Sequence, residues 1–114
     1  MQTHQVTLDE TNRAVFDERA RVFKALAHPT RLFLLERLAE CEHCVCQLRD
    51  MVGSDISTVS KHLSVLRSAG IVGVERRGQQ MWYRLKMPCV LNFFTCIESV
   101  LRQDAAARLK VIGR

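Results

Sequence analysis

The stretch I-S-T-V-S-K-H-L-S-V-L-R-S-A-G-I-V, residues 56–72, predicts the fold of this chain more strongly than any other. Its apolar residues Val59, Leu63 and Leu66 fall at i, i+4 and i+7, so they share one face of a helix. The other face carries short hydroxyl side chains and fixed positive charges, which suit a helix that lies in a DNA groove. Gly70 marks the end of the helix. A polar helix face is usually only solvated, so the DNA interpretation depends on the segments on either side.

The flanking segments have the pattern of a winged helix. Residues 47–52 form a short helical pattern and residues 53–55 a glycine-containing turn, which with the next helix make a helix-turn-helix at about 47–70. Apolar and polar residues alternate over residues 72–85 around a tip that contains glycine, which predicts a β-hairpin wing. The side chains expected to contact DNA are Ser57, Thr58, Ser60, Lys61, His62 and Arg67 on the helix, with Arg76 and Arg77 on the wing.

The order of these motifs resembles that of the ArsR/SmtB family. The resemblance rests on K-A-L-A-H-P-T-R-L-F-L-L-E-R-L (24–38), C-V-C-Q-L (44–48), the helix and the wing, and it covers about residues 15–85. It implies a small dimeric winged-helix repressor that senses metals or other thiol-reactive agents and binds double-stranded operator DNA. We therefore expect one domain over residues 1–114, mainly α-helical with a β-hairpin wing.

Helical patterns also occupy both ends of the chain. Thr7 or Asp9 can cap a first helix, and Pro29 suits the first turn of a second helix that ends about eleven residues later. The last helix, at about 90–110, carries more apolar residues than the core of a small domain needs. It either closes the core or pairs with a second subunit. The resemblance and the two-fold symmetry of palindromic operators favour a homodimer that pairs through helices at about 8–27 and 90–110.

Composition narrows the class of partner and the cellular compartment. The chain has 17 Lys and Arg against 12 Asp and Glu, a net charge of +5 that agrees with a nucleic-acid partner. No apolar run approaches the length of a membrane span, and residues 1–10 lack the pattern of a signal peptide. We therefore expect no membrane partner and a cytoplasmic location, where thiols stay reduced. Five cysteines in that compartment favour metal or redox chemistry over a disulfide framework.

Cys41, Cys44 and Cys46 place three thiols within six residues, between the second helix and the helix-turn-helix. Thiolates are soft donors, so the cluster is expected to bind As(III) or Sb(III) as inducer, with Cd(II), Pb(II) or Zn(II) as further candidates. His43 could act as a fourth ligand for Zn(II). Binding would pull the start of the short helix towards the loop and shift the recognition helix that it supports.

The resemblance bears on the same cluster. Arsenic-responsive members of the family carry a Cys-Val-Cys inducer site, which Cys44 and Cys46 match. Their usual third thiol falls three residues later, where this chain has Arg49, so Cys41 is expected to supply the third sulfur from the other side. Zinc- and cobalt-sensing relatives place ligands in the last helix. Residues 90–110 contain no histidine, so that second kind of site is not expected here.

The remaining cysteines and histidines receive plainer interpretations. Cys89 and Cys96 are interpreted as core or interface residues, because free cysteines often behave as small hydrophobic side chains. His28 precedes a proline at a helix start and is interpreted as a capping or packing residue. The roles of His4 and His43 stay open.

Two alternatives compete with the ion-sensing interpretation. In the first, Cys44 or Cys46 forms a disulfide or polysulfide with Cys96, so that oxidation releases DNA. In the second, the C-x-x-C spacing at 41–44 belongs to a thiol-disulfide oxidoreductase. That chemistry expects a β-strand before the motif, whereas the preceding segment is leucine-rich and helical in pattern. No other catalytic constellation is visible, so we do not expect an enzyme.

Overall fold

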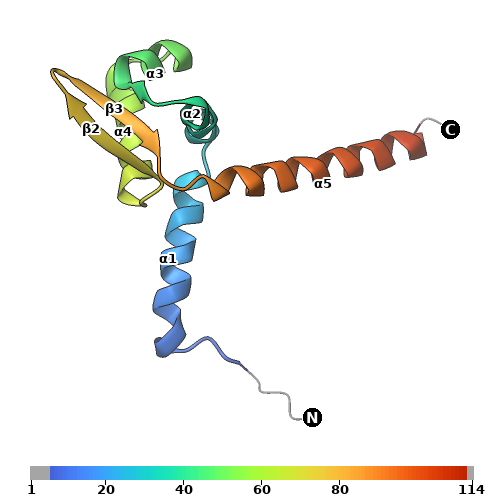
Figure 1. Cartoon of the computed structure of the whole chain (residues 1–114). Helices are drawn as coiled ribbons and strands as arrows, with labels where there is room; N and C mark the ends of the chain where they lie inside the picture. Colours follow the sequence, from blue (N-terminus) through green and yellow to red (C-terminus); the bar gives the residue numbers. More distant parts are fainter. Residues whose placement is uncertain (1–5, 113–114) are drawn as a thin grey trace.

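The computed structural model describes residues 6–112, and Figure 1 shows its helices and strands. In chain order they are α1 (Glu10–Leu26), α2 (Pro29–Glu40), β1 (His43–Cys44), α3 (Val45–Val52), α4 (Ile56–Ser68), β2 (Val72–Arg77), β3 (Gln80–Leu85) and α5 (Cys89–Ile112). The helix-turn-helix consists of α3 and α4, and the wing consists of β2 and β3. The predicted fold class, mainly helical with a hairpin wing, is confirmed.

The sheet has three strands in the order β1-β3-β2, and both neighbouring pairs are antiparallel. In the wing, Arg77 lies opposite Gln80, and Gly78 takes a positive φ of 65° at the tip, a conformation that favours glycine. β1 adds to the other edge of β3, with Cys44 opposite Trp82. The sequence did not predict this third strand, which joins the cysteine segment to the wing.

The core lies between α2, α3, α4 and the base of the wing. Its fully buried leucines, each 0% exposed, are Leu34, Leu35, Leu48, Leu63 and Leu66. Full burial of one such side chain contributes roughly 1.5–3 kcal/mol relative to exposure. Since Val59, Leu63 and Leu66 are all buried, the opposite face of α4 is turned outward. We call α2, α3, α4 and the sheet the body of the molecule.

Local hydrogen bonds place the helix ends close to where the sequence predicted them. Asp9 is the cap used by α1, and its carboxylate accepts from the Thr11 N–H at 2.9 Å. His28 caps α2, since its Nδ1 accepts from the Thr30 N–H at 3.1 Å. Gly70, with φ of 78°, follows the end of α4. The capping role of His28 and the position of the glycine stop are therefore confirmed.

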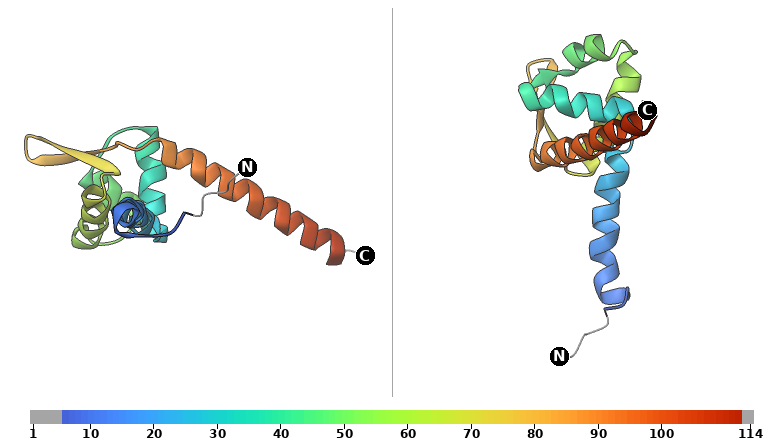
Figure 2. Two further views of the ribbon diagram at one scale, coloured as in Figure 1. Left: turned by 90° about the horizontal axis from the view of Figure 1, so that it is seen from below. Right: turned by 90° about the vertical axis from the view of Figure 1, so that its right-hand side faces the viewer.

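Two arms, α1 and α5, project from the body in different directions (Figures 1 and 2). The radius of gyration is 18.8 Å, against about 13 Å for a compact chain of this length. Both arms expose large apolar side chains: Val15, Phe16 and Phe23 on α1, and Phe93, Ile97, Val100, Leu101 and Leu109 on α5. Within residues 6–112, no helix has the length and apolar character needed to span a bilayer.

Candidate nucleic-acid interface and cysteine loop

The outer face of α4 carries most of the predicted DNA contacts. Four of the six predicted side chains on this helix are exposed: Ser57, Thr58, Lys61 and Arg67. The other two, Ser60 and His62, are half-buried. A lysine, an arginine and two hydroxyl groups are therefore exposed along this helix, which suits a helix that lies in the major groove.

Asp55, directly before α4, holds two of these hydroxyl groups. The Ser57 Oγ donates to Asp55 Oδ2 at 2.5 Å, and the Thr58 Oγ1 donates to Asp55 Oδ1. These bonds, that from Ser57 first, lower the pKa of the Asp55 carboxyl from its usual value. Because both hydroxyl hydrogens point at the carboxylate, Ser57 and Thr58 present lone pairs outward. Such acceptors suit the exocyclic amino groups of adenine or cytosine.

His62 is less available to DNA than its neighbours on α4. Its ring is half-buried, with the ring centroid 4.3 Å from that of His28 at the start of α2. Burial lowers the pKa of His62, and electrostatic interactions with His28 and Arg31 lower it further. We therefore assign His62 chiefly to the packing of α4 against α2. Its DNA contact stays a prediction.

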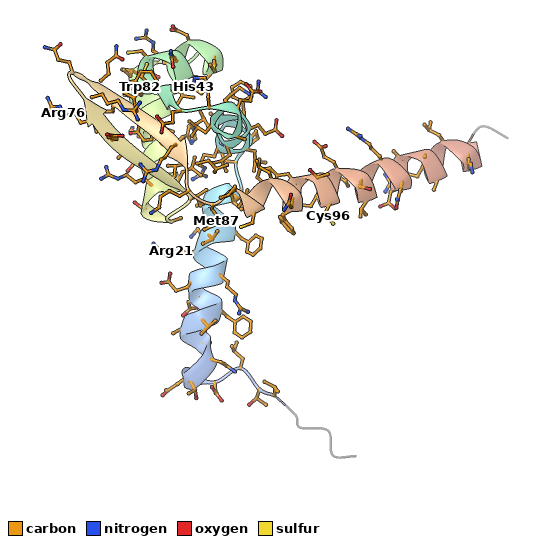
Figure 3. All side chains as sticks on the ribbon, in the orientation of Figure 1. Arg21, His43, Arg76, Trp82, Met87 and Cys96 are labelled. Carbon is orange, nitrogen blue, oxygen red and sulfur yellow. The ribbon has the colours of Figure 1, made fainter. Side chains whose placement is uncertain are left out.

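The two wing arginines have different surroundings; Figure 3 labels Arg76, and Trp82 on the neighbouring strand. Arg76 is exposed, and its Nε donates to the Gly78 carbonyl at 3.1 Å. Arg77 donates to a carboxylate oxygen of Glu42 at 2.7 Å and to Glu75 at 3.0 Å. Its guanidinium also lies 5.3 Å from the centre of the Trp82 ring.

Those contacts determine what each arginine can do. The two carboxylates, Glu42 first, raise the pKa of Arg77, so its charge is permanent but already paired. Within residues 6–112, no ion pair holds Arg76. Arg76 is thus the wing arginine that is ready to meet a phosphate, while Arg77 links the wing to the segment that contains the cysteines.

The cysteine loop, residues 41–46, does not form a ready-made ion site. Cys41 is exposed, Cys46 is half-buried, and Cys44 is only 4% exposed. The Cys41 Sγ lies 3.5 Å from His43 Nε2, so two of the predicted donors are in contact. Over residues 6–112, no three His, Cys, Asp or Glu side chains are grouped as metal ligands are. The ligand set Cys41, Cys44 and Cys46 therefore stays a prediction.

Two residues of this region were missed by the sequence reasoning. Gln47 accepts from the Cys44 backbone N–H at 3.2 Å, and its Oε1 also lies 3.2 Å from His43 Nδ1. This is the reciprocal half of a capping box, and a Gln three residues after the helix cap could have indicated it. The second missed residue is Glu42. Its partner Arg77 lies 35 residues away, so local sequence spacing does not connect the two.

Cys89 and Cys96 are both exposed on α5 (Cys96 is labelled in Figure 3). The interpretation of these thiols as core residues is therefore wrong. Most of α5 projects from the body, so the body does not cover these two side chains. Their place in an interface stays a prediction. His4 lies outside the described residues.

Known proteins resemble this chain over most of its length. The sequence pattern described as "Bacterial regulatory protein, arsR family" matches residues 28–74. The uncharacterized HTH-type transcriptional regulator Rv0081 of Mycobacterium tuberculosis (strain ATCC 25618 / H37Rv) is 36% identical over 95 residues, which are 82% of this chain and 83% of that protein. The biofilm growth-associated repressor of Xylella fastidiosa (strain Temecula1 / ATCC 700964) is 40% identical over 82 residues, 72% of this chain and 70% of the repressor.

A solved structure supports the same relationship. It is the homodimeric winged helix-turn-helix DNA-binding domain (fragment 1-100) of Mb0332 from Mycobacterium bovis, a possible ArsR-family transcriptional regulator. That domain is 31% identical to this chain, with a TM-score of 0.73, and the match covers 87% of this chain and 92% of the domain. The chain thus belongs to the arsR family of bacterial regulatory proteins, and its body is the DNA-binding winged helix-turn-helix of a transcriptional regulator.

Proposed function

We propose that this protein is a homodimeric repressor that binds a palindromic operator and leaves it when a soft ion, As(III) or Sb(III), binds Cys41, Cys44 and Cys46. The observation that carries the proposal is the position of the cysteine loop. Its residues form β1, which is hydrogen-bonded to the wing, and they lead directly into α3. A change in this loop therefore reaches both elements that flank the recognition helix.

The donor atoms fit the proposed inducer. Three thiolates are soft ligands, which select soft, thiophilic ions over Mg²⁺ or Ca²⁺. To gather them, the exposed Cys41 and the half-buried Cys46 would have to turn towards the buried Cys44. That movement would displace β1 and the first turn of α3. The protein would then be unable to bind the ion and keep its DNA-binding conformation at the same time. Cd(II) and Pb(II) suit the same three sulfurs, and Zn(II) could use His43 as a fourth ligand.

Homodimer formation is supported by the apolar arms and by the homodimeric Mycobacterium bovis relative. Two recognition helices, related by a two-fold axis, would read two half-sites one turn of DNA apart. The exposed Ser57, Thr58 and Lys61 would contact bases or the groove edge, and Arg76 the phosphate backbone.

Release by arsenite tests the inducer site. In a gel shift under reducing conditions, Cys44→Ser and Cys46→Ser should bind the operator like the parent but resist release, because a hydroxyl is a poor ligand for a soft ion. Cys89→Ser is the matched control and should respond normally. Cys41→Ser tests the third ligand separately. Normal release of both the Cys44 and the Cys46 variants would show that the inducer does not bind here.

A second candidate function is thiol oxidation, and the exposure of Cys41 and Cys96 favours it, since oxidants reach exposed thiols first. Disulfide formation between Cys44 or Cys46 and Cys96 would transfer two electrons and two protons to a peroxide, which becomes water. Release by peroxide in the absence of metal, lost in Cys96→Ser and restored by a reductant, would support this function. Release by arsenite in the fully reduced protein would support the ion-sensing one.

A further inference from the structure

A second positively charged surface lies between α1, α2 and α4. We call it the basic groove, and its polar lining consists of Arg21 and Lys24 from α1, Arg31 from α2, and Ser64 and Ser68 from α4. It is an open groove with a volume of about 420 Å³, and no carboxylate is among its lining residues. Three cations and two hydroxyl groups around an open cavity are the chemistry of an anion site. None of the sequence predictions placed a function here.

Arg21 is held in place, and the three cations of the basic groove are only partly neutralised. One terminal nitrogen of Arg21 donates to the Ser68 carbonyl at 2.8 Å, which ties the side chain to the end of α4. The other donates to Glu18 at 2.9 Å, in an exposed pair that is easily exchanged for a stronger anion. Within residues 6–112, no ion pair holds Lys24 or Arg31, and the Arg31 Nε is buried without a hydrogen-bond partner.

The basic groove continues the DNA-facing surface of α4. Ser57, Lys61, Ser64 and Ser68 fall at i, i+4, i+7 and i+11, so they follow one line along the helix. The 13 residues of α4 span about 20 Å, whereas the major groove is about 12 Å wide. If the N-terminal residues of α4 contact base edges, its C-terminal half extends past the groove to the neighbouring phosphates.

We propose that the basic groove binds the phosphate backbone of operator DNA, as a contact separate from the wing; this rests on the DNA-binding function proposed above. Figure 3 shows Arg21 on the side of α1 that faces away from α5. Helix α5 of the same chain therefore does not block DNA from the basic groove. Phe16 and Phe23, seven residues apart, form a different face of the same helix. An apolar interface and a phosphate contact can thus use the same arm.

The salt dependence of DNA binding tests the basic groove. Arg21→Gln/Lys24→Gln in the full chain is compared with Arg102→Gln/Lys110→Gln, which removes the same charge and whose Arg102 has a similar exposed pair, with Glu98 at 3.7 Å. The affinity for a mixed-sequence duplex is measured by fluorescence anisotropy at several salt concentrations. Loss of two phosphate contacts in each protomer should flatten the slope of log K against log salt by about 1.8 per protomer, or about 3.6 for the proposed homodimer, and the control should keep the parent slope.

Further variants separate this contact from folding and from the proposed function. Should the double variant lose its far-UV circular dichroism, Lys24→Gln against Lys110→Gln serves instead, with an expected change of slope of about 0.9 per protomer, or about 1.8 for the homodimer. An unchanged slope in the groove variant overturns the inference. If Arg76→Gln flattens the slope in the same experiment, the proposed DNA-binding function still stands. A parent protein that binds no duplex overturns both. Binding of inorganic phosphate that the double variant loses, with an unchanged DNA slope, would assign the groove to a free anion and also overturn the inference.

Discussion

The body and the arms of this molecule differ in how far their large apolar side chains are exposed to solvent. The body buries most of its leucines within one chain, and Leu63 is 0% exposed. The arms leave theirs in solvent, and Leu101 on α5 is 61% exposed. Both regions carry large apolar residues at helical spacing, so that spacing alone does not tell a core helix from an interface helix. The body is thus stabilised by its own contacts, whereas the large apolar side chains of the arms are left mostly exposed, as the proposed homodimer requires.

The largest expected effect comes from the core of the body. Leu63→Ala should lower the free energy of unfolding by about 2–5 kcal/mol, because it removes buried methyl groups and leaves a cavity beneath the recognition helix. Urea denaturation followed by circular dichroism measures the change. Leu101→Ala is the matched control and should cost far less at protein concentrations below the dimer dissociation constant. Equal losses in the two variants would contradict the division into body and arms.

An acidic residue on the arm should break the dimer and leave the body folded. Leu101→Asp places a charge in the apolar face of α5 and should raise the dimer dissociation constant about thirtyfold or more, the loss of an interface anchor worth about 2 kcal/mol. Sedimentation equilibrium measures it. Gln103→Asp adds the same charge two residues away on an exposed position and should change the constant little. A Leu101→Asp protein that stays dimeric would place the partner contact elsewhere.

The ion pair between Glu42 and Arg77 tests how a contact within the body limits DNA binding. Glu42→Gln should release Arg77 from its shortest ion pair, so that the arginine can contact one more phosphate. The slope of log K against log salt should become steeper by about 0.9 per protomer, or about 1.8 for the homodimer, while the free energy of unfolding changes by less than about 1 kcal/mol. Glu40→Gln removes the same charge close by and serves as control. A flatter slope in Glu42→Gln would mean that the pair holds Arg77 in its DNA-binding position instead.

The smallest expected effect is a pH dependence inside the body. The pKa of His62 is lowered by burial and then by His28 and Arg31. As pH falls through the ordinary value of 6.5, the unfolded chain takes up the proton before the folded chain does. The free energy of unfolding should therefore decrease from pH about 8 towards about 5.5, and His62→Gln should flatten that decrease. Urea denaturation across this range measures it, and identical profiles for parent and variant would show that His62 does not titrate in this way.

Much of this architecture could be predicted because it depends on local spacing. The buried positions of α4, the stop at Gly70 and the wing follow from periods of 3.6 and 2 residues and from glycine at the turns. β1 could not, since a strand of two residues has no period. The pair between Glu42 and Arg77 joins residues far apart in sequence. His62 lies at the border of the two faces of α4, and only the position of α2 decides whether it packs or meets solvent.

In the proposed homodimer, the exposed arms would also make the amount of dimer depend on the concentration of the protein itself. A chain that buries its apolar arms only against a second copy pairs by mass action, and its stability depends on protomer concentration. Below the dimer dissociation constant, the concentration of dimer rises with the square of the number of chains. Operator occupancy then changes more steeply than protein level, so a twofold dilution at cell division could remove up to about three quarters of the dimers. The apolar surface of the arms would thus set the protein concentration above which the operator is occupied, without any inducer.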